Sequence, residues 1–272
     1  MKKLNNVTLV MQETMYHDLA AKSLEYTLAR CEFAEVVTFS NRDILPGARN
    51  VQIEHFPSLS DYCEFMLRGM LPYINTEFML FQQWDAMVHD ATAWQDQFLE
   101  YDYIGARWPF WHEGKNIGNG GFSLRSHRLL EALQDPIIQM QPNNRHAEHE
   151  DQLIGMEHRG YLTRRYGIKY PHSELARRFS YEIGDYVPSW GFHGPWNIVK
   201  FCDDDTVEYF IERMNYCGWN HFKWHHILFA LIKRGRPDLA EQVTLKMTTH
   251  GAEHVNAVLK WLKRDNFAGD IQ

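Results

Sequence analysis

The sequence predicts an α/β fold followed by a helical C-terminal region. Two observations predict it. Up to residue 82 the chain alternates short apolar runs with helical patterns, as βαβ units do, and from residue 203 onward it reads as successive amphipathic helices. The 272 residues, 44% of them hydrophobic, suffice for one large domain or two small ones and are too apolar for a disordered chain. We expect an α/β domain over 1–202 and a helical region over 203–272.

The apolar runs and their flanking residues predict the elements in order. Strands are expected over 7–12, 34–39, 51–54 and 77–82, where short apolar runs end in polar residues. Helices are expected over 17–30 and 58–71, the second with Ser58 or Ser60 as its N-cap and ending before Pro72.

Charge and cysteine usage restrict the class of protein. Lys and Arg number 28 and Asp and Glu 35, which gives a net charge of −7 and argues against general binding to nucleic acid or an anionic membrane. The four cysteines form no CxxC pair, which argues against a zinc ribbon or a thiol redox motif. The first ten residues lack a signal-peptide core, and no apolar run approaches ~18 residues. These features predict a soluble, cytoplasmic protein.

Polar residues follow two of the predicted strands. Gln12-Glu13-Thr14 stands at the end of the first strand, and Gln82-Gln83-Trp84-Asp85 stands at the end of the strand over 77–82. Open α/β sheets bind ligands beyond the carboxyl ends of their strands. Asp85 could therefore hold a divalent cation, although an aspartate in this position is also common as a turn or cap residue.

A glycine-rich segment, Gly118-Asn119-Gly120-Gly121, precedes Phe122-Ser123-Leu124-Arg125-Ser126. Three glycines in four residues permit positive φ angles and a close approach of the backbone to a ligand. A tight turn between two strands is the alternative interpretation.

Two further segments carry groups with possible chemistry. Glu150 and Asp151 stand at the start of a predicted helix, where carboxylates are favoured by the helix dipole and where one could act as a general base. The aromatic loop Trp190-Gly191-Phe192-His193-Gly194-Pro195-Trp196-Asn197 contains one histidine, either a metal ligand or a ring packed between indoles.

The order of these segments resembles a little-characterised family of glycosyltransferases with the GT-A fold. The series is Gln83-Trp84-Asp85, YDYIGARW over 101–108, GNGGFSLRS over 118–126, Glu150-Asp151, RFSYE over 178–182 and GFHGPWN over 191–197. The second and third segments match the family's blocks closely, and the resemblance covers roughly residues 5–200. The family's first block usually reads Gln-Thr-Asp, so this chain differs in having Trp84, and it has one carboxylate where a DXD motif has two.

The resemblance implies a GT-A-like, Rossmann-type sheet that binds a nucleotide-diphosphate sugar. It implies a divalent cation, Mn²⁺ or Mg²⁺, held by Asp85 and His193, and a general base at Asp151, with Glu150 as the fallback. A single displacement with such a base would invert the anomeric centre. The residues expected to contact donor or acceptor are Gln12, Glu13, Thr14, Gln82, Gln83, Trp84, Arg107, Trp108, Asn119, Gly120, Gly121, Arg125 and Trp196.

Two other functions remain open. A nucleotidyltransferase would use similar metal chemistry, but it usually carries a glycine-rich basic loop after the first strand, where this chain has Gln12-Glu13-Thr14. A carbohydrate-binding protein that has lost turnover is the other. The acceptor is expected to be a glycan, a glycoconjugate or another hydroxyl compound, with nucleic acid disfavoured, and the helical tail could recognise it, brace the sheet or form a homo-oligomer.

Overall fold

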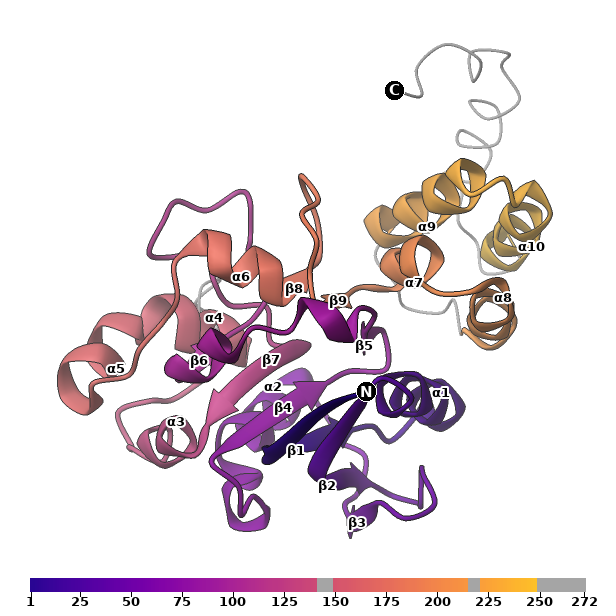
Figure 1. Ribbon diagram of the computed structural model, residues 1–272. Coiled ribbons are helices and arrows are strands. Elements are labelled where there is room, and N and C mark those ends of the chain that lie inside the picture. The colour runs from indigo at the N-terminus through magenta and orange to yellow at the C-terminus, as the bar shows by residue number, and fades with distance from the viewer. Residues whose placement is uncertain (141–148, 215–220, 249–272) are drawn as a thin grey trace. The chain divides into compact units, whose positions relative to one another are not determined.

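The computed structural model describes residues 1–140, 149–214 and 221–248. The chain forms two compact units, Met1–His193 and Gly194–Gln272 (Figure 1). Residues 194–202 thus group with the helical unit rather than with the sheet.

A six-stranded sheet forms the centre of the first unit, in the order β3-β2-β1-β4-β7-β6. The strands β1, β2, β3 and β4 are parallel, β7 is antiparallel to β4, and β6 is antiparallel to β7. The α/β prediction is therefore confirmed. The bounds are β1 (Lys2–Gln12), β2 (Cys31–Ser40), β3 (Arg49–Gln52), β4 (Phe78–Gln82), β6 (Tyr103–Ile104) and β7 (Phe122–Ser126).

The helix predicted over 58–71 is divided into three short elements. They are α2 (Leu59–Glu64), a π-helical turn (Phe65–Gly69) and a 3₁₀ turn (Leu71–Tyr73). Of the two expected N-caps, Ser58 is the one that caps α2, because its side chain accepts a hydrogen bond from the Asp61 amide, whereas Ser60 lies inside the helix. The Met66 carbonyl in the π turn accepts a long-range bond from Arg125, a contact that sequence periodicity does not show.

The other helices of the first unit pack around the sheet. Helix α1 (His17–Leu28) contacts β2 and β5, and α3 (His127–Ala132) follows β7 directly. Apolar residues of β1, β2 and β4 form one core cluster with the π turn and α3. The remaining elements are the 3₁₀ turns Ala91–Ala93 and Asp96–Glu100, α4 (Glu150–Gln152), a π turn (Leu153–Glu157), α5 (Arg159–Tyr166) and α6 (Ser173–Phe179).

A second, three-stranded sheet has the order β5-β9-β8. Its strands are β5 (Ala86–Val88), β8 (Ser180–Tyr181) and β9 (Gly191–His193). Strand β9 packs on the larger sheet: a Cβ at Gly191 would lie 2.3 Å from the Phe122 ring. These strands have two or three residues each, too few to produce a visible alternation in the sequence.

The second unit is helical, as predicted, throughout its described residues. It contains α7 (Pro195–Phe201), α8 (Asp204–Arg213), α9 (His221–Lys233) and α10 (Pro237–Thr248). Asp203 caps α8 by accepting a hydrogen bond from the Thr206 amide. The rest of the predicted tail, 215–220 and 249–272, lies outside the described residues. In the part of the chain that the structure describes, no helix has the length and apolar character needed to span a membrane.

Candidate functional site

The pairing of short strands brings Asp85 and His193 together. The backbone N–H of Gln83 donates to the Gly121 carbonyl at 2.8 Å, and a turn from Gln83 to Ala86 then leads into β5. In the β5–β9 pair, Ala86 lies opposite His193. As a result, Asp85 Oδ1 lies 3.5 Å from His193 Nε2, and both side chains are buried.

Two more oxygen atoms face the His193 ring. In the β8–β9 pair, Tyr181 lies opposite Phe192, so Glu182 comes beside His193, with Oε1 3.2 Å from Nδ1. Gln83 Oε1 lies 3.1 Å from Nε2. An uncharged imidazole carries one N–H, so it can donate to one of these two sides only. When that proton is on Nδ1, facing Glu182, the Nε2 lone pair is available to a cation.

The donor set beside Nε2 suits a small divalent cation. Asp85 supplies a carboxylate oxygen, Gln83 an amide oxygen and His193 an imidazole nitrogen, while Glu182 would orient the ring from Nδ1 as a carboxylate partner does at metal-bound histidines. No group of three or more His, Cys, Asp or Glu side chains suited to a metal is found among the described residues. A cation here would therefore need further ligands from a bound phosphate, as Mg²⁺ commonly does.

The glycine loop, Gly118–Gly121, passes so close to neighbouring side chains that it leaves no room for a Cβ at Gly120 or Gly121. None of Gly118, Gly120 and Gly121 has a positive φ, so the positive φ angles that these glycines permit are not used here. A Cβ at Gly121 would lie 2.3 Å from His193 Nε2 and 2.5 Å from Gln83 Oε1. A Cβ at Gly120 would lie 2.3 Å from Glu150 Oε1 and 3.1 Å from the Asp151 Cβ. Two successive glycines therefore separate the Asp85–His193 pair from the acidic pair.

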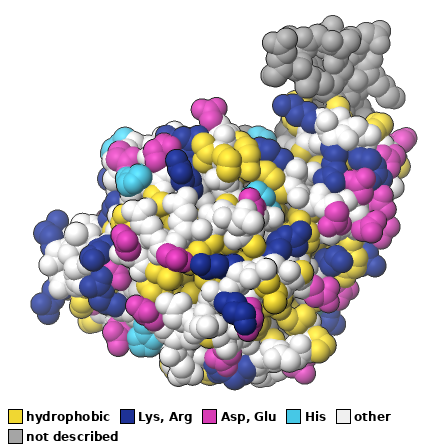
Figure 2. All heavy atoms as spheres, in the orientation of Figure 1, with side chains coloured by type: hydrophobic (Ala, Val, Ile, Leu, Met, Phe, Trp, Pro, Cys, Tyr) yellow, Lys and Arg dark blue, Asp and Glu magenta, His cyan; other side chains and the backbone are white. Residues whose placement is uncertain are grey.

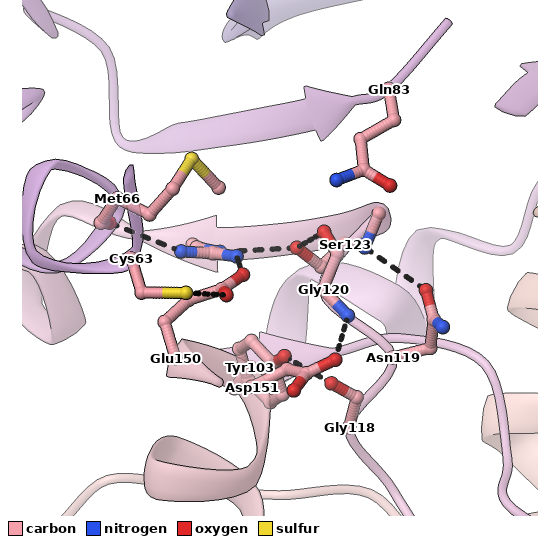
Figure 3. Close-up of polar contacts among 12 residues, drawn as sticks. Cys63, Met66, Gln83, Tyr103, Gly118, Asn119, Gly120, Ser123, Glu150 and Asp151 are labelled. Carbon is pink, nitrogen blue, oxygen red and sulfur yellow. Dashed lines mark hydrogen bonds and ion pairs between the residues drawn. The ribbon is translucent and has the colours of Figure 1, made fainter. Parts of the chain in front are cut away.

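Glu150 is held in a buried ion pair (Figure 3). Its Oε1 accepts a hydrogen bond from Arg125 Nη2 at 3.1 Å, and its Oε2 accepts one from the Cys63 thiol at 3.7 Å. Burial, with the Glu150 charge second, raises the pKa of Cys63 to about 12, so the thiol stays protonated and donates.

Arg125 is fully buried, and its guanidinium is occupied by protein groups. Besides Glu150, its Nε donates to Ser123 Oγ at 3.0 Å and its Nη1 to the Met66 carbonyl at 3.3 Å. The contact with donor or acceptor expected for Arg125 does not fit this position. Its place in the structure instead fixes Glu150 against β7.

Asp151 has different partners from its neighbour. Its Oδ2 accepts a hydrogen bond from the Gly120 amide at 2.9 Å, and its Oδ1 accepts one from the Gln152 amide at 2.7 Å. The side chain is partly exposed, yet desolvation, followed by the Glu150 charge, raises the pKa of Asp151 to about 7. A carboxyl that gains and loses a proton near neutral pH is suited to general acid–base chemistry. In Figure 3 Asp151 and Gln83 lie on either side of Gly120.

The residues expected after β1 differ in their surroundings. Gln12 is buried, and its Oε1 has no hydrogen-bond partner among the described residues. Glu13 caps the following turn by accepting from the Met15 and Tyr16 amides, and Thr14 Oγ1 pairs with His55 at 2.9 Å.

The residues expected at the end of β4 also differ in their surroundings. The amide of Gln82 is used entirely in the core, where it bonds Ser23 and Thr27 on α1. Trp84 packs beside the Tyr16 ring, with centroids 5.6 Å apart. Gln83 is therefore the one amide of this segment that faces the Asp85–His193 pair.

The remaining predicted residues lie at three places. Trp108 packs on the glycine loop, because a Cβ at Gly118 would lie 2.7 Å from its ring, and Asn119 Oδ1 accepts a hydrogen bond from the Gly121 amide. Arg107 forms a β-bridge with Ile117. Trp196 lies in the second unit, where its ring is 5.2 Å from that of His226.

Sequence reasoning missed two residues of this site. Glu182 belongs to the RFSYE segment, whose acid could have been noticed, but its place beside His193 depends on the β8–β9 register. Tyr62 accepts a hydrogen bond from Gln83 Nε2 at 2.9 Å, which directs the amide oxygen of Gln83 toward His193. No local pattern in the sequence indicates that contact.

A family model described as "Protein of unknown function (DUF5672)" matches residues 47–189, a stretch that includes the acidic pair, the glycine loop and Asp85. The chain belongs to this DUF5672 family. A comparison with curated protein sequences finds no match.

Three solved structures share part of the fold of this DUF5672 protein. A glycosyltransferase involved in the glycosylation of the major capsid of PBCV-1 is 11% identical, with a TM-score of 0.46 over 83% of this chain and 98% of that chain. An active-site mutant of LgtC is 13% identical, with a TM-score of 0.44 over 81% of this chain and 99% of that chain. The galactosyltransferase LgtC with donor and acceptor sugar analogs is 11% identical, with a TM-score of 0.41 over 86% of this chain and 95% of that chain. Likeness at this level does not identify an activity.

Proposed function

We propose that this DUF5672 protein transfers a sugar from a nucleotide-diphosphate donor to a hydroxyl acceptor, with a divalent cation and by a single displacement. The observation that supports this most is the glycine loop at the carboxyl end of β4. Gly121 borders the Asp85–His193 pair, and Gly120 borders a carboxyl with a pKa near 7. The two adjacent glycines thus have a proposed cation site on one side and a proposed general base on the other. Glycosyl transfer to a hydroxyl can use both, the cation to stabilise the leaving diphosphate and the base to deprotonate the acceptor.

The donor would bind where the strand order reverses, between β1 and β4. In the parallel pairing Val10 lies opposite Phe81, so Gln12 comes level with Gln83 two residues later. The unpartnered Oε1 of Gln12 would accept a hydrogen bond from the nucleoside. Asp85, Gln83 and His193 would hold the cation, which neutralises charge on the leaving diphosphate when it is bound.

Asp151 would act on the acceptor side of the loop. Its carboxylate would take the proton of the acceptor hydroxyl as that oxygen attacks the anomeric carbon and the bond to the diphosphate breaks. The amides of Gly120 and Gln152 hold the carboxylate in place during this transfer. Attack from the face opposite the leaving group inverts the anomeric centre.

A transfer and hydrolysis assay with a panel of nucleotide sugars and Mn²⁺ tests this function. We expect wild type to turn over at least one donor and Asp85→Ala to lose Mn²⁺-dependent donor binding, by about 10-fold or more. Asp43→Ala, which removes an exposed carboxylate, is the matched control. An Asp85→Ala protein equal to wild type in binding and turnover would remove the cation assignment. Binding of sugars without turnover of any donor would favour a carbohydrate-binding protein instead.

A further inference from the structure

Two arginines near the acidic pair have no acidic partner. Arg107 and Arg159 are both half-buried, and neither makes an ion pair or a side-chain hydrogen bond with any described residue. Among the described residues, the Nε of Arg107 and the Nη1 of Arg159 are buried without a hydrogen-bond partner. The Arg159 guanidinium lies over the Tyr170 ring, 4.5 Å from its centroid, a contact that leaves its charge uncompensated, and burial lowers the pKa of Arg159. A partly buried guanidinium is costly unless an anion accompanies it.

The backbone places both arginines along the segment that starts at Asp151. Arg107 is bridged to Ile117, and a Cβ at the next residue, Gly118, would lie 3.4 Å from the Asp151 carbonyl oxygen. A Cβ at Gly155 would lie 2.5 Å from the Ile117 carbonyl. The bridge containing Arg107 therefore lies beside the segment from Asp151 to Gly155, which ends four residues before Arg159 at the start of α5.

Two neutral oxygens in the same region also lack a hydrogen-bond partner among the residues that the structure describes. They are Oδ1 of Asn116, which is only 2% exposed, and Oε1 of Gln152. Water could satisfy these amide oxygens, but it could not neutralise the arginines. The charge of Glu113 acts on Arg159, but Glu113 accepts hydrogen bonds from Asn116 Nδ2 at 3.4 Å and from the Ser173 amide at 3.2 Å and forms no ion pair with Arg159.

We propose that Arg107, Arg159, Asn116 and Gln152 line the acceptor subsite, and that the acceptor carries an anionic group, a carboxylate or a phosphate, close to its hydroxyls. This inference rests on the proposed function, because only a transferase has an acceptor. The two guanidinium groups bind the anion, since arginine has the fork of donors that matches carboxylate and phosphate oxygens. The two amide oxygens accept hydrogen bonds from hydroxyl groups of the same molecule.

Direct binding to the full chain tests this site without turnover. The probes are glucuronate, glucose 1-phosphate and neutral glucose, followed by the ¹⁵N NMR signals of the arginine Nε–H groups and by calorimetric titration. We expect at least one anionic probe to bind and to shift the Arg107 signal, and glucose to bind at least about 10-fold more weakly. The two anionic probes show whether a carboxylate or a phosphate is preferred.

Arg107→Met and Arg159→Met should each weaken binding of the anionic probe about 10-fold or more, because each removes a charge-assisted contact. Arg164→Met, which removes an exposed arginine from the same helix as Arg159, is the control and should bind as wild type does. Equal affinity of wild type and both variants, or equal binding of glucose, would overturn the proposal.

The outcomes separate this inference from the proposed function. A protein that binds glucuronate through Arg107 but transfers no sugar would contradict the proposed function alone. If the protein transfers a sugar and neither Arg107→Met nor Arg159→Met changes kcat/KM for any acceptor, only the proposal of an anionic acceptor is contradicted.

Discussion

Glu150 and Asp151 are adjacent carboxylates that the fold places in different chemical surroundings. Glu150 is paired with the buried Arg125 and receives the Cys63 thiol, so its charge is compensated. Asp151 receives two backbone amides, and burial together with the Glu150 charge raises its pKa to about 7. Adjacent acids in surroundings this different commonly divide their roles, so that only one of them exchanges a proton during catalysis.

The pH dependence of transfer should report Asp151. Its raised pKa means that the base form predominates above pH 7 and is lost as the pH falls through that value, so kcat/KM should rise with pH around 7. Asp151→Asn should keep donor binding and lose transfer by about 10²-fold or more, because the general base is gone. Steady-state kinetics from pH 5 to 9 and a donor titration measure both effects.

Glu150→Gln tests whether Asp151, rather than Glu150, is the general base. Removing the Glu150 charge takes away a cause of the raised Asp151 pKa, so the acid limb of the profile should move to lower pH while transfer persists. A Glu150→Gln protein without transfer, beside an active Asp151→Asn protein, would assign the base to Glu150.

The sequence allowed the acidic pair, Asp85 and His193 to be proposed because these residues stand in recognisable blocks. It did not allow their partners to be predicted. Arg125 was expected to face a ligand, but the structure buries it on β7 with Glu150 and the Met66 carbonyl as partners. Those contacts join residues 25 and 59 positions apart, and local patterns carry no information about such pairs.

At the level of elements, short strands and one loop position the candidate site. The longer strands β1, β2 and β4 were predictable from apolar runs, whereas β5, β8 and β9 have only two or three residues. These short strands set the register that joins Asp85, Glu182 and His193. The part of the fold that forms the proposed cation site was therefore the part least visible in the sequence.

The glycine loop provides a paired test of the two halves of the site. In Gly121→Ala the new Cβ would meet His193 Nε2 and Gln83 Oε1, so Mn²⁺-dependent donor binding should weaken by about 10-fold or more. In Gly120→Ala the new Cβ would meet Glu150 Oε1, and displacing this buried pair should lower the free energy of unfolding by about 1–3 kcal/mol. Calorimetric titration of the donor and urea denaturation measure these effects.

The two variants control each other. Both add one methyl group in the same loop, so a general disturbance of the loop would change donor affinity equally in both. Equal donor affinities for Gly120→Ala and Gly121→Ala would contradict the separation of a cation side from an acidic side.

At the scale of the whole molecule, the net charge and one face of the surface can be compared. The chain carries −7 overall, and the face shown in Figure 2 has acidic and basic side chains side by side among hydrophobic ones. Such a face does not supply the single-sign field that attracts a polyanion over a distance. Recognition of an anionic acceptor would therefore depend on the few guanidinium groups of the acceptor subsite.

The division into two compact units predicts two unfolding transitions. Each unit has its own buried side chains: Phe98 packs against Trp94 and Phe179 in the first unit, and Leu231 is fully buried on α9 in the second. Calorimetry of the full chain should show separate transitions, since units with separate cores need not unfold together. Phe98→Ala should lower the midpoint of one transition and Leu231→Ala that of the other, because each leaves a cavity that costs about 2–5 kcal/mol. A single transition lowered equally by both substitutions would show that the units unfold as one cooperative structure.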